Sequence, residues 1–95
     1  MKDFEREVVS VFGGYLFELR KKFELSQERL ADQAGLDRNY IGQIERGVKE
    51  PCLASIVRIA LGFGMSPSDM LKGFDDAAAM KRVQKHHWSL QPTRG

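Results

Sequence analysis

The chain has 95 residues, a length that fits one domain and leaves little room for both an enzyme pocket and the scaffold around it. Hydrophobic residues make up 42% of the chain and charged residues 29%, which excludes a disordered segment and indicates a globular domain. The formal net charge of +2 does not by itself indicate a nucleic-acid partner, because DNA binding needs a local basic face rather than a basic whole.

Apolar residues recur at helical spacing over residues 4–23, and this pattern predicts either one helix or two short ones. They are Val8, Val9, Phe12, Leu16, Leu19 and Phe23. Gly13 and Gly14 lie inside the pattern and together cost about 2 kcal/mol relative to alanine in a helix interior. They mark either a break, with Ser10 as the N-cap of the second piece, or a close contact with another helix; the sequence leaves both open.

Two short helices are predicted next, each with a capping residue at its start and a glycine at its end. Ser26 is a good N-cap for a helix over residues 27–34, and Gly35 favours the left-handed conformation that ends it. Asp37 is the expected N-cap of a helix over residues 38–46, which Gly47 ends.

The second half of the chain also has a helical pattern. A helix is predicted over residues 53–63, with five inward positions: Leu53, Ile56, Val57, Ile59 and Ala60. Ser66 and Pro67 are the expected N-cap and first-turn proline of a fifth helix, which ends near residue 73. Asp75 is a candidate N-cap for a short extra helix that ends near residue 85. The sequence therefore predicts an all-α fold.

The pair of short helices carries the functional signal. Ala31, four residues before Gly35, is small enough for two helices to cross closely, and Ile41 and Ile44 hold the second helix against the first. The opposite face of the second helix is polar and consists of Arg38, Asn39, Gly42, Gln43 and Arg46. Arginine matches guanine, and asparagine or glutamine matches adenine, in the major groove that a helix-turn-helix motif occupies with its second helix.

The words "LSQERLA" and "AGLDRNYIGQIERG", followed by "P…L…I…IA…GMS", resemble the Cro/repressor-type helix-turn-helix family, also called the xenobiotic-response-element family. The phrase "LDRNYIGQIERG" is also similar to controller proteins of restriction–modification systems. The resemblance covers residues 12–73 and implies a compact, five-helix, lambda-repressor-like bundle that binds DNA as a twofold dimer. Outside the resemblance, we expect residues 1–11 to extend the first helix and residues 74–95 to form a C-terminal helix and tail, a candidate contact for a second subunit or a partner.

The resemblance also implies roles for single residues. Base-contacting positions are Arg38, Asn39 and Gln43, against the alternative of an ordinary solvated helix face. Backbone-contacting positions are Gln27, Tyr40 and Arg46. The alternatives are a simple helix start, a ring packed on the core edge, and a free or C-capping arginine, respectively. Arg20 and Glu45 fall where many family members form an ion pair between the first and third helices. Gly42 departs from the usual serine or alanine.

The dimer surface is less clearly marked. Met70 and Phe74 on the fifth helix, together with Trp88 in the tail, are the candidate interface residues, and Leu71, Met80 and Val83 belong to the same apolar set. The alternative is that these side chains close the core of the monomer.

Two functions of different classes fit these features. The first is a homodimeric transcriptional regulator that binds an inverted-repeat operator in double-stranded DNA, with one reading helix in each major groove. The second is a protein-interaction module such as an antitoxin, which uses the flanks to hold a toxin or another protein partner.

Other classes are disfavoured. The sequence contains no Gly-rich phosphate loop, no metal-ligand spacing and no nucleophile beside a base, so we expect neither an enzyme nor a cofactor. His86 and His87 suit a metal poorly and are expected in a solvated tail, and Cys52 is expected to be structural rather than redox-active. A single cysteine and no apolar run of membrane length predict a soluble, cytoplasmic protein without a membrane partner.

Overall fold

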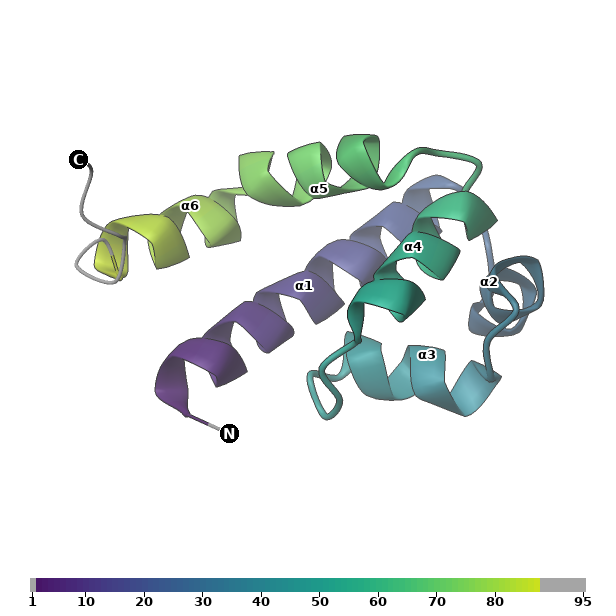
Figure 1. Cartoon of the computed structure of the whole chain (residues 1–95), viewed down its shortest axis with the longest axis horizontal. Helices are drawn as coiled ribbons and strands as arrows, with labels where there is room; N and C mark the ends of the chain where they lie inside the picture. Colours follow the sequence, from purple (N-terminus) through teal and green to yellow (C-terminus); the bar gives the residue numbers. More distant parts are fainter. Residues whose placement is uncertain (1, 88–95) are drawn as a thin grey trace.

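Six helices make up the computed structural model, which describes residues 2–87 (Figure 1). They are α1 (Asp3–Lys22), α2 (Gln27–Ala34), α3 (Arg38–Glu45), α4 (Leu53–Gly62), α5 (Pro67–Asp76) and α6 (Ala78–His86). No strand occurs between residues 2 and 87, so the all-α prediction is confirmed. The long α1 runs through the middle of the molecule, with α3 and α4 on one side of it and α5 and α6 on the other (Figure 1).

The core lies where α1 to α5 meet. Its largest fully buried side chains include Leu16, Leu30, Ile41, Ile44, Ile59 and Met70. They come from all five helices at the inward positions of each helical repeat, so apolar burial accounts for the way the helices assemble. Ala31 and Ala34 are also buried, as the close crossing of α2 with its neighbours requires.

α1 is one continuous helix, and its two glycines differ in role. A Cβ on Gly13 would collide with the main-chain carbonyl oxygen of Ile44 and lie 2.7 Å from that of Glu45, both near the end of α3. A Cβ on Gly14 would meet nothing within 4 Å. Gly13 is therefore a position of close helix contact, and neither glycine breaks the helix.

The predicted caps at three helix starts are confirmed. The Ser26 hydroxyl accepts from the Arg29 N–H at 3.0 Å, and the Asp37 carboxylate accepts from the Asn39 N–H at 2.7 Å. The Ser66 hydroxyl accepts from the Asp69 N–H at 3.1 Å. Each bond satisfies one of the backbone donors that a helix leaves open at its N-terminus.

The prediction for the end of α5 is wrong. The helix passes through Gly73 and continues to Asp76, and Ala77, not Asp75, precedes α6. Gly73 marks a close approach, since a Cβ there would collide with the Tyr15 hydroxyl, which donates to the Met70 carbonyl at 2.8 Å. The Asp75 carboxylate instead accepts from the Gln84 amide, across the junction between α5 and α6.

Two further expectations about burial are wrong. Leu53 begins α4 and is 75% exposed, because the first turn of that helix projects beyond the core. His87 is half-buried against the N-terminal half of α1, where its ring Nε2–H donates to the Glu7 carboxylate at 2.8 Å and its ring makes an edge-to-face contact with Phe4. α6 thus folds back onto the start of α1, and its Val83 is buried there.

The proposed boundaries of the central domain fall within helices. Residue 11 lies inside α1, and residue 73 lies inside α5. The two flanks therefore continue helices of the central bundle, and they pack against each other through α1 and α6.

Candidate nucleic-acid interface

The α2–turn–α3 unit holds the candidate interface. Gly35 adopts a φ of 69°, a left-handed conformation that glycine tolerates at least cost, and ends α2. The Leu36 N–H donates to the Ala31 carbonyl at 2.9 Å and closes the turn. Ala34, in the last turn of α2, lies against Gly62 of α4. A Cβ added to Gly62 would lie only 3.1 Å from the Cβ of Ala34. The direction of α3 is therefore fixed by the turn and by the packing of α2 on α4.

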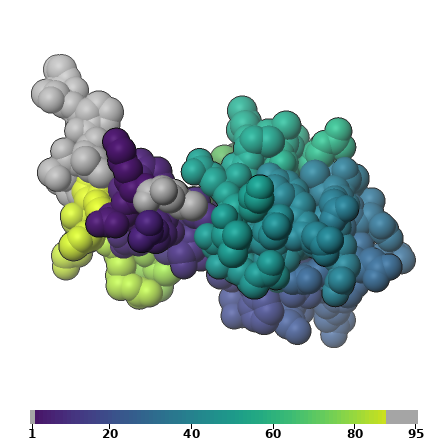
Figure 2. Space-filling model, turned by 90° about the horizontal axis from the view of Figure 1, so that it is seen from below, coloured from purple at the N-terminus to yellow at the C-terminus, as the bar shows by residue number. Residues whose placement is uncertain are grey.

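α3 has one buried face and one outward face. Ile41 and Ile44 are fully buried, whereas Arg38, Asn39 and Arg46 are exposed. Gln43 is half-buried at the edge of the outward face. α3 lies at the lower edge of the molecule in Figure 1, so its surface faces the reader in Figure 2, which views the molecule from below. The structure thus brings the three predicted base-contacting side chains onto one accessible helix.

Gly42 is buried, contrary to the expectation that it forms part of the free face. The position of a Cβ on this residue lies 3.2 Å from a guanidinium nitrogen of Arg46 and 3.6 Å from the side-chain oxygen of Gln27. The two side chains, one at the end of α3 and one at the start of α2, therefore converge over the missing side chain. This places both of these predicted backbone-contacting residues at one spot.

A buried ion pair holds the end of α3 against α1. Arg20 of α1 makes a two-pronged interaction with Glu45, with Nε–Oε2 and Nη2–Oε1 distances of 2.7 and 3.0 Å. The side chains are only 8% and 5% exposed. The hydrogen bond from the guanidinium to Glu45 raises the pKa of Arg20 above its ordinary value, so the guanidinium stays charged.

The same pair ties three helices together. A third nitrogen of Arg20 donates to the Leu25 carbonyl at 2.8 Å, just before α2. The Gln27 amide donates to Glu45 at 2.9 Å. Arg20 and Glu45 therefore link the end of α1, the start of α2 and the end of α3, and they orient Gln27. The sequence does not predict the hydrogen bonds of this pair with Leu25 and Gln27, because no spacing rule marks them.

Tyr40 departs from the expected role. Its ring packs against the core, and its hydroxyl donates to the Ser55 hydroxyl at 3.0 Å. Since a phenol has one proton and a phosphate oxygen only accepts hydrogen bonds, this geometry does not present Tyr40 to the DNA backbone. The alternative, packing at the edge of the core, describes the residue better. Nothing in the sequence identifies Ser55 as its partner.

Cys52 lies beside the same serine. Its Sγ is 3.2 Å from the Ser55 hydroxyl, and this hydrogen bond lowers the pKa of the thiol. The cysteine is exposed at the N-cap of α4.

The candidate dimer residues do not share an open surface. Met70 is fully buried in the core, and so the prediction that it contacts a second subunit is wrong. Phe74 is half-buried and packs edge-on against Phe12, with 5.3 Å between the ring centroids. Trp88 lies outside the described residues. The first two side chains therefore serve mainly the monomer core, the alternative that the sequence left open.

Residues 2–87 contain no helix that is both long and apolar enough to cross a membrane. Within the same range, no group of three or more metal-ligating side chains is brought together.

Comparison with known proteins places this geometry in a family. The helix-turn-helix family model matches residues 16–70, which include the whole α2–turn–α3 unit. The chain is 38% identical over 65 residues to the control protein C.MunI of Mycoplasma sp, an alignment that covers 67% of this chain and 88% of that protein. It is 39% identical over 62 residues to the control protein C.BamHI of Bacillus amyloliquefaciens, covering 64% of this chain and 76% of the relative.

A solved structure agrees. The crystal structure of the restriction–modification controller protein C.AhdI from Aeromonas hydrophila superposes with a TM-score of 0.62 at 40% identity, over 65% of this chain and 94% of that one. Together with the buried Ile41–Ile44 face and the outward polar face of α3, these matches confirm the family resemblance drawn from the sequence. The chain belongs to the Cro/repressor-type, or xenobiotic-response-element, family of helix-turn-helix DNA-binding proteins.

Proposed function

We propose that this protein is a cytoplasmic transcriptional regulator of the restriction–modification controller type, which inserts α3 into the major groove of a specific double-stranded DNA site. One observation carries the proposal: α3 has its apolar face closed by Ile41 and Ile44 and its outward face built from Arg38, Asn39 and Gln43. The Arg20–Glu45 pair holds the end of this helix against α1, and the Gly35 turn connects its start to α2.

The outward residues of α3 contact the bases in this proposal. Arg38 and Asn39 occupy the first turn of α3, the end that enters the groove in helix-turn-helix proteins, and Gln43 lies just over one turn later. Arginine provides two parallel donors for the acceptors of guanine, whereas the amides of Asn39 and Gln43 match the donor and acceptor of adenine.

Gln27 and Arg46 contact phosphate in this proposal. They converge over Gly42, so an arginine charge lies beside the first residue of α2. A helix N-terminus favours an anion through its open N–H groups and the helix dipole, and arginine adds a direct charge. The contact orients the protein on the duplex and makes binding depend on salt.

A homodimer would place two copies of α3 in successive major grooves about one helical turn apart, so the operator would be an inverted repeat. The named relatives are control and controller proteins, and this supports a regulatory role for the DNA binding. The residues that join the two subunits are not the buried Met70 or the largely internal Phe74.

The proposal is tested by titrating the protein with a duplex obtained by binding-site selection and with an unrelated duplex of the same length. Asn39→Ala is expected to weaken binding to the selected duplex by about 1–3 kcal/mol and to leave binding to the unrelated duplex unchanged. Arg46→Ala is expected to weaken both and to reduce the slope of log affinity against log salt by about one.

Arg29→Ala is the matched control, because Arg29 is an exposed arginine on α2 to which the proposal assigns no DNA contact. Its affinity for both duplexes is expected to stay close to that of the wild type. The proposal is contradicted if Asn39→Ala and Arg46→Ala reduce binding to the two duplexes alike, or if neither change reduces binding more than the control.

A further inference from the structure

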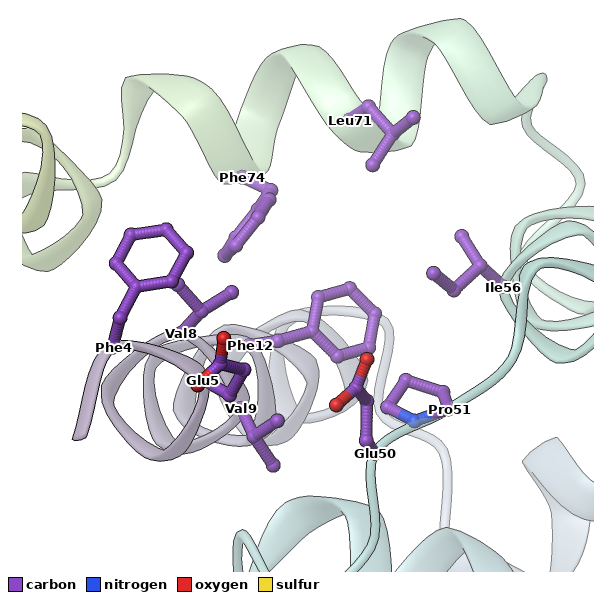
Figure 3. A pocket seen from close by; sticks show the side chains of 10 residues that line it. All are labelled: Phe4, Glu5, Val8, Val9, Phe12, Glu50, Pro51, Ile56, Leu71 and Phe74. Carbon is purple, nitrogen blue, oxygen red and sulfur yellow. The ribbon is translucent and has the colours of Figure 1, made fainter. Parts of the chain in front are cut away.

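A pocket of about 200 Å³ lies between α1, α5 and the segment that joins α3 to α4, away from the outward face of α3 (Figure 3). Its walls are largely apolar and consist of Phe4, Val8, Val9, Phe12, Pro51, Ile56, Leu71 and Phe74. For comparison, an engineered protein cavity of about 150 Å³ lined by apolar side chains binds benzene. The pocket is therefore large enough for one aromatic ring or a short alkyl chain.

Two carboxylates complete the lining. Glu5 lies in the first turn of α1, and Glu50 comes from the loop after α3 (Figure 3). Oε2 of Glu5 is buried and has no hydrogen-bond partner among residues 2–87. Burying a charged oxygen without a partner is costly, and a cation placed beside it offsets that cost. Neither lysine, arginine nor histidine is among the lining residues.

The DNA-binding motif does not require this pocket. Seven of its ten lining residues, from Phe4 to Phe12 and then Leu71 and Phe74, lie outside residues 16–70, which the helix-turn-helix family model matches. The pocket arises because α1 starts well before that segment and α5 continues beyond it. Only Glu50, Pro51 and Ile56 come from the matched part, and the first two follow α3 closely.

We propose that this pocket binds a small organic cation, namely a primary ammonium group that carries one aromatic ring or a short alkyl chain. The ammonium group donates to the buried oxygen of Glu5 and to Glu50, and the apolar part lies against the walls formed by α1 and α5. Charge complementarity selects this chemistry, because an anion would face two carboxylates and a neutral molecule would leave the Glu5 oxygen without a charged partner. The proposal does not depend on DNA binding.

The test titrates the full-length protein with three probes of equal chain length: hexylammonium, 1-hexanol and hexanoate. Binding is followed by methyl NMR. Hexylammonium is expected to shift the signals of Val8 and Leu71 and to bind at least about tenfold more tightly than 1-hexanol, while hexanoate gives no saturable shift. Glu5→Gln, which keeps the shape of the side chain, is expected to reduce the affinity for hexylammonium by about tenfold or more.

Glu18→Gln is the matched control, since Glu18 is an exposed glutamate on the same helix and does not line the pocket. It is expected to bind hexylammonium as the wild type does. The proposal is overturned by equal affinity for hexylammonium and hexanol, by shifts that map away from the pocket, or by an unchanged affinity of Glu5→Gln. It is also overturned if the methyl signals of Val8 and Leu71 shift when the protein is diluted without any probe. Such a shift would show that a second copy of the chain occupies the pocket.

Discussion

The two adjacent glycines of α1 are predicted to respond to alanine in opposite directions. On Gly13 a new Cβ would collide with the Ile44 carbonyl oxygen and lie 2.7 Å from the Glu45 carbonyl oxygen. Both obstacles are main-chain atoms of α3, so no side chain can rotate away to make room. On Gly14 a new Cβ would meet nothing within 4 Å. The pair therefore separates steric contact from helix propensity at neighbouring positions of one helix.

The magnitudes follow from two terms. Replacing glycine by alanine within a helix favours folding by about 1 kcal/mol, and this term is common to both variants. Overpacking a well-packed contact costs about 1–3 kcal/mol, and the upper end applies where the backbone must move. Gly14→Ala is thus expected to raise the free energy of unfolding by about 1 kcal/mol. Gly13→Ala is expected to lower it by about 2 kcal/mol.

Urea unfolding followed by far-UV circular dichroism measures both values. With a denaturant slope of about 1 kcal/mol/M, typical of the lower end for small proteins, the two midpoints are expected to differ by about 3 M. Equal midpoints would show that α1 and α3 do not approach at Gly13 as described. A Gly13→Ala variant more stable than the wild type would refute the reasoning outright.

Three further predictions concern other contacts of the structure. Removing one member of the buried Arg20–Glu45 pair is expected to lower the free energy of unfolding by about 3–5 kcal/mol. The Arg20→Ala/Glu45→Ala double variant is expected to lose much less than the sum of the two single variants, and a double-mutant cycle with no coupling energy would contradict this. Gly42→Ala is expected to raise the free energy of unfolding by up to about 1 kcal/mol, yet to weaken binding to every duplex, because the new Cβ displaces the Arg46 guanidinium. A variant that is more stable but binds DNA as the wild type does would show that Gly42 is not needed to position Arg46. The hydrogen bond from Gln84 and the charge of Lys81 lower the pKa of Asp75 below its ordinary value of 3.8, so its stabilising effect is present above that pH and is lost as pH falls below it. Asp75→Asn is expected to remove this part of the acid dependence, and a wild-type acid profile in that variant would contradict the assignment.

Features set by neighbouring residues were predictable from the sequence. The caps at Ser26, Asp37 and Ser66 form because a short polar side chain reaches an N–H two or three residues ahead, so local spacing is enough to find them. The left-handed turn at Gly35 is local in the same sense. The burial of Ile41 and Ile44 and the exposure of Arg38 and Asn39 follow from the helical period of α3, although the burial of Gly42 does not.

Features set by tertiary contact were not predictable. Gly13 and Gly14 look alike in the sequence, but only one of them meets α3. Gly73 resembles a helix stop, yet it is the place where the Tyr15 hydroxyl approaches α5. The hydroxyl of Tyr40 donates to Ser55, fifteen residues away, and no periodic pattern encodes that pairing. In each case the partner comes from another helix, whose position depends on the assembled core.

Selection of binding sites from a random DNA pool with purified protein tests the central claim most directly. The account predicts enrichment of an inverted repeat whose half-sites lie about one helical turn apart, with guanine or adenine favoured where Arg38, Asn39 and Gln43 reach the bases. Recovery of random sequences by a protein that folds as described would contradict the claim. The outward face of α3 would then serve a protein partner rather than DNA.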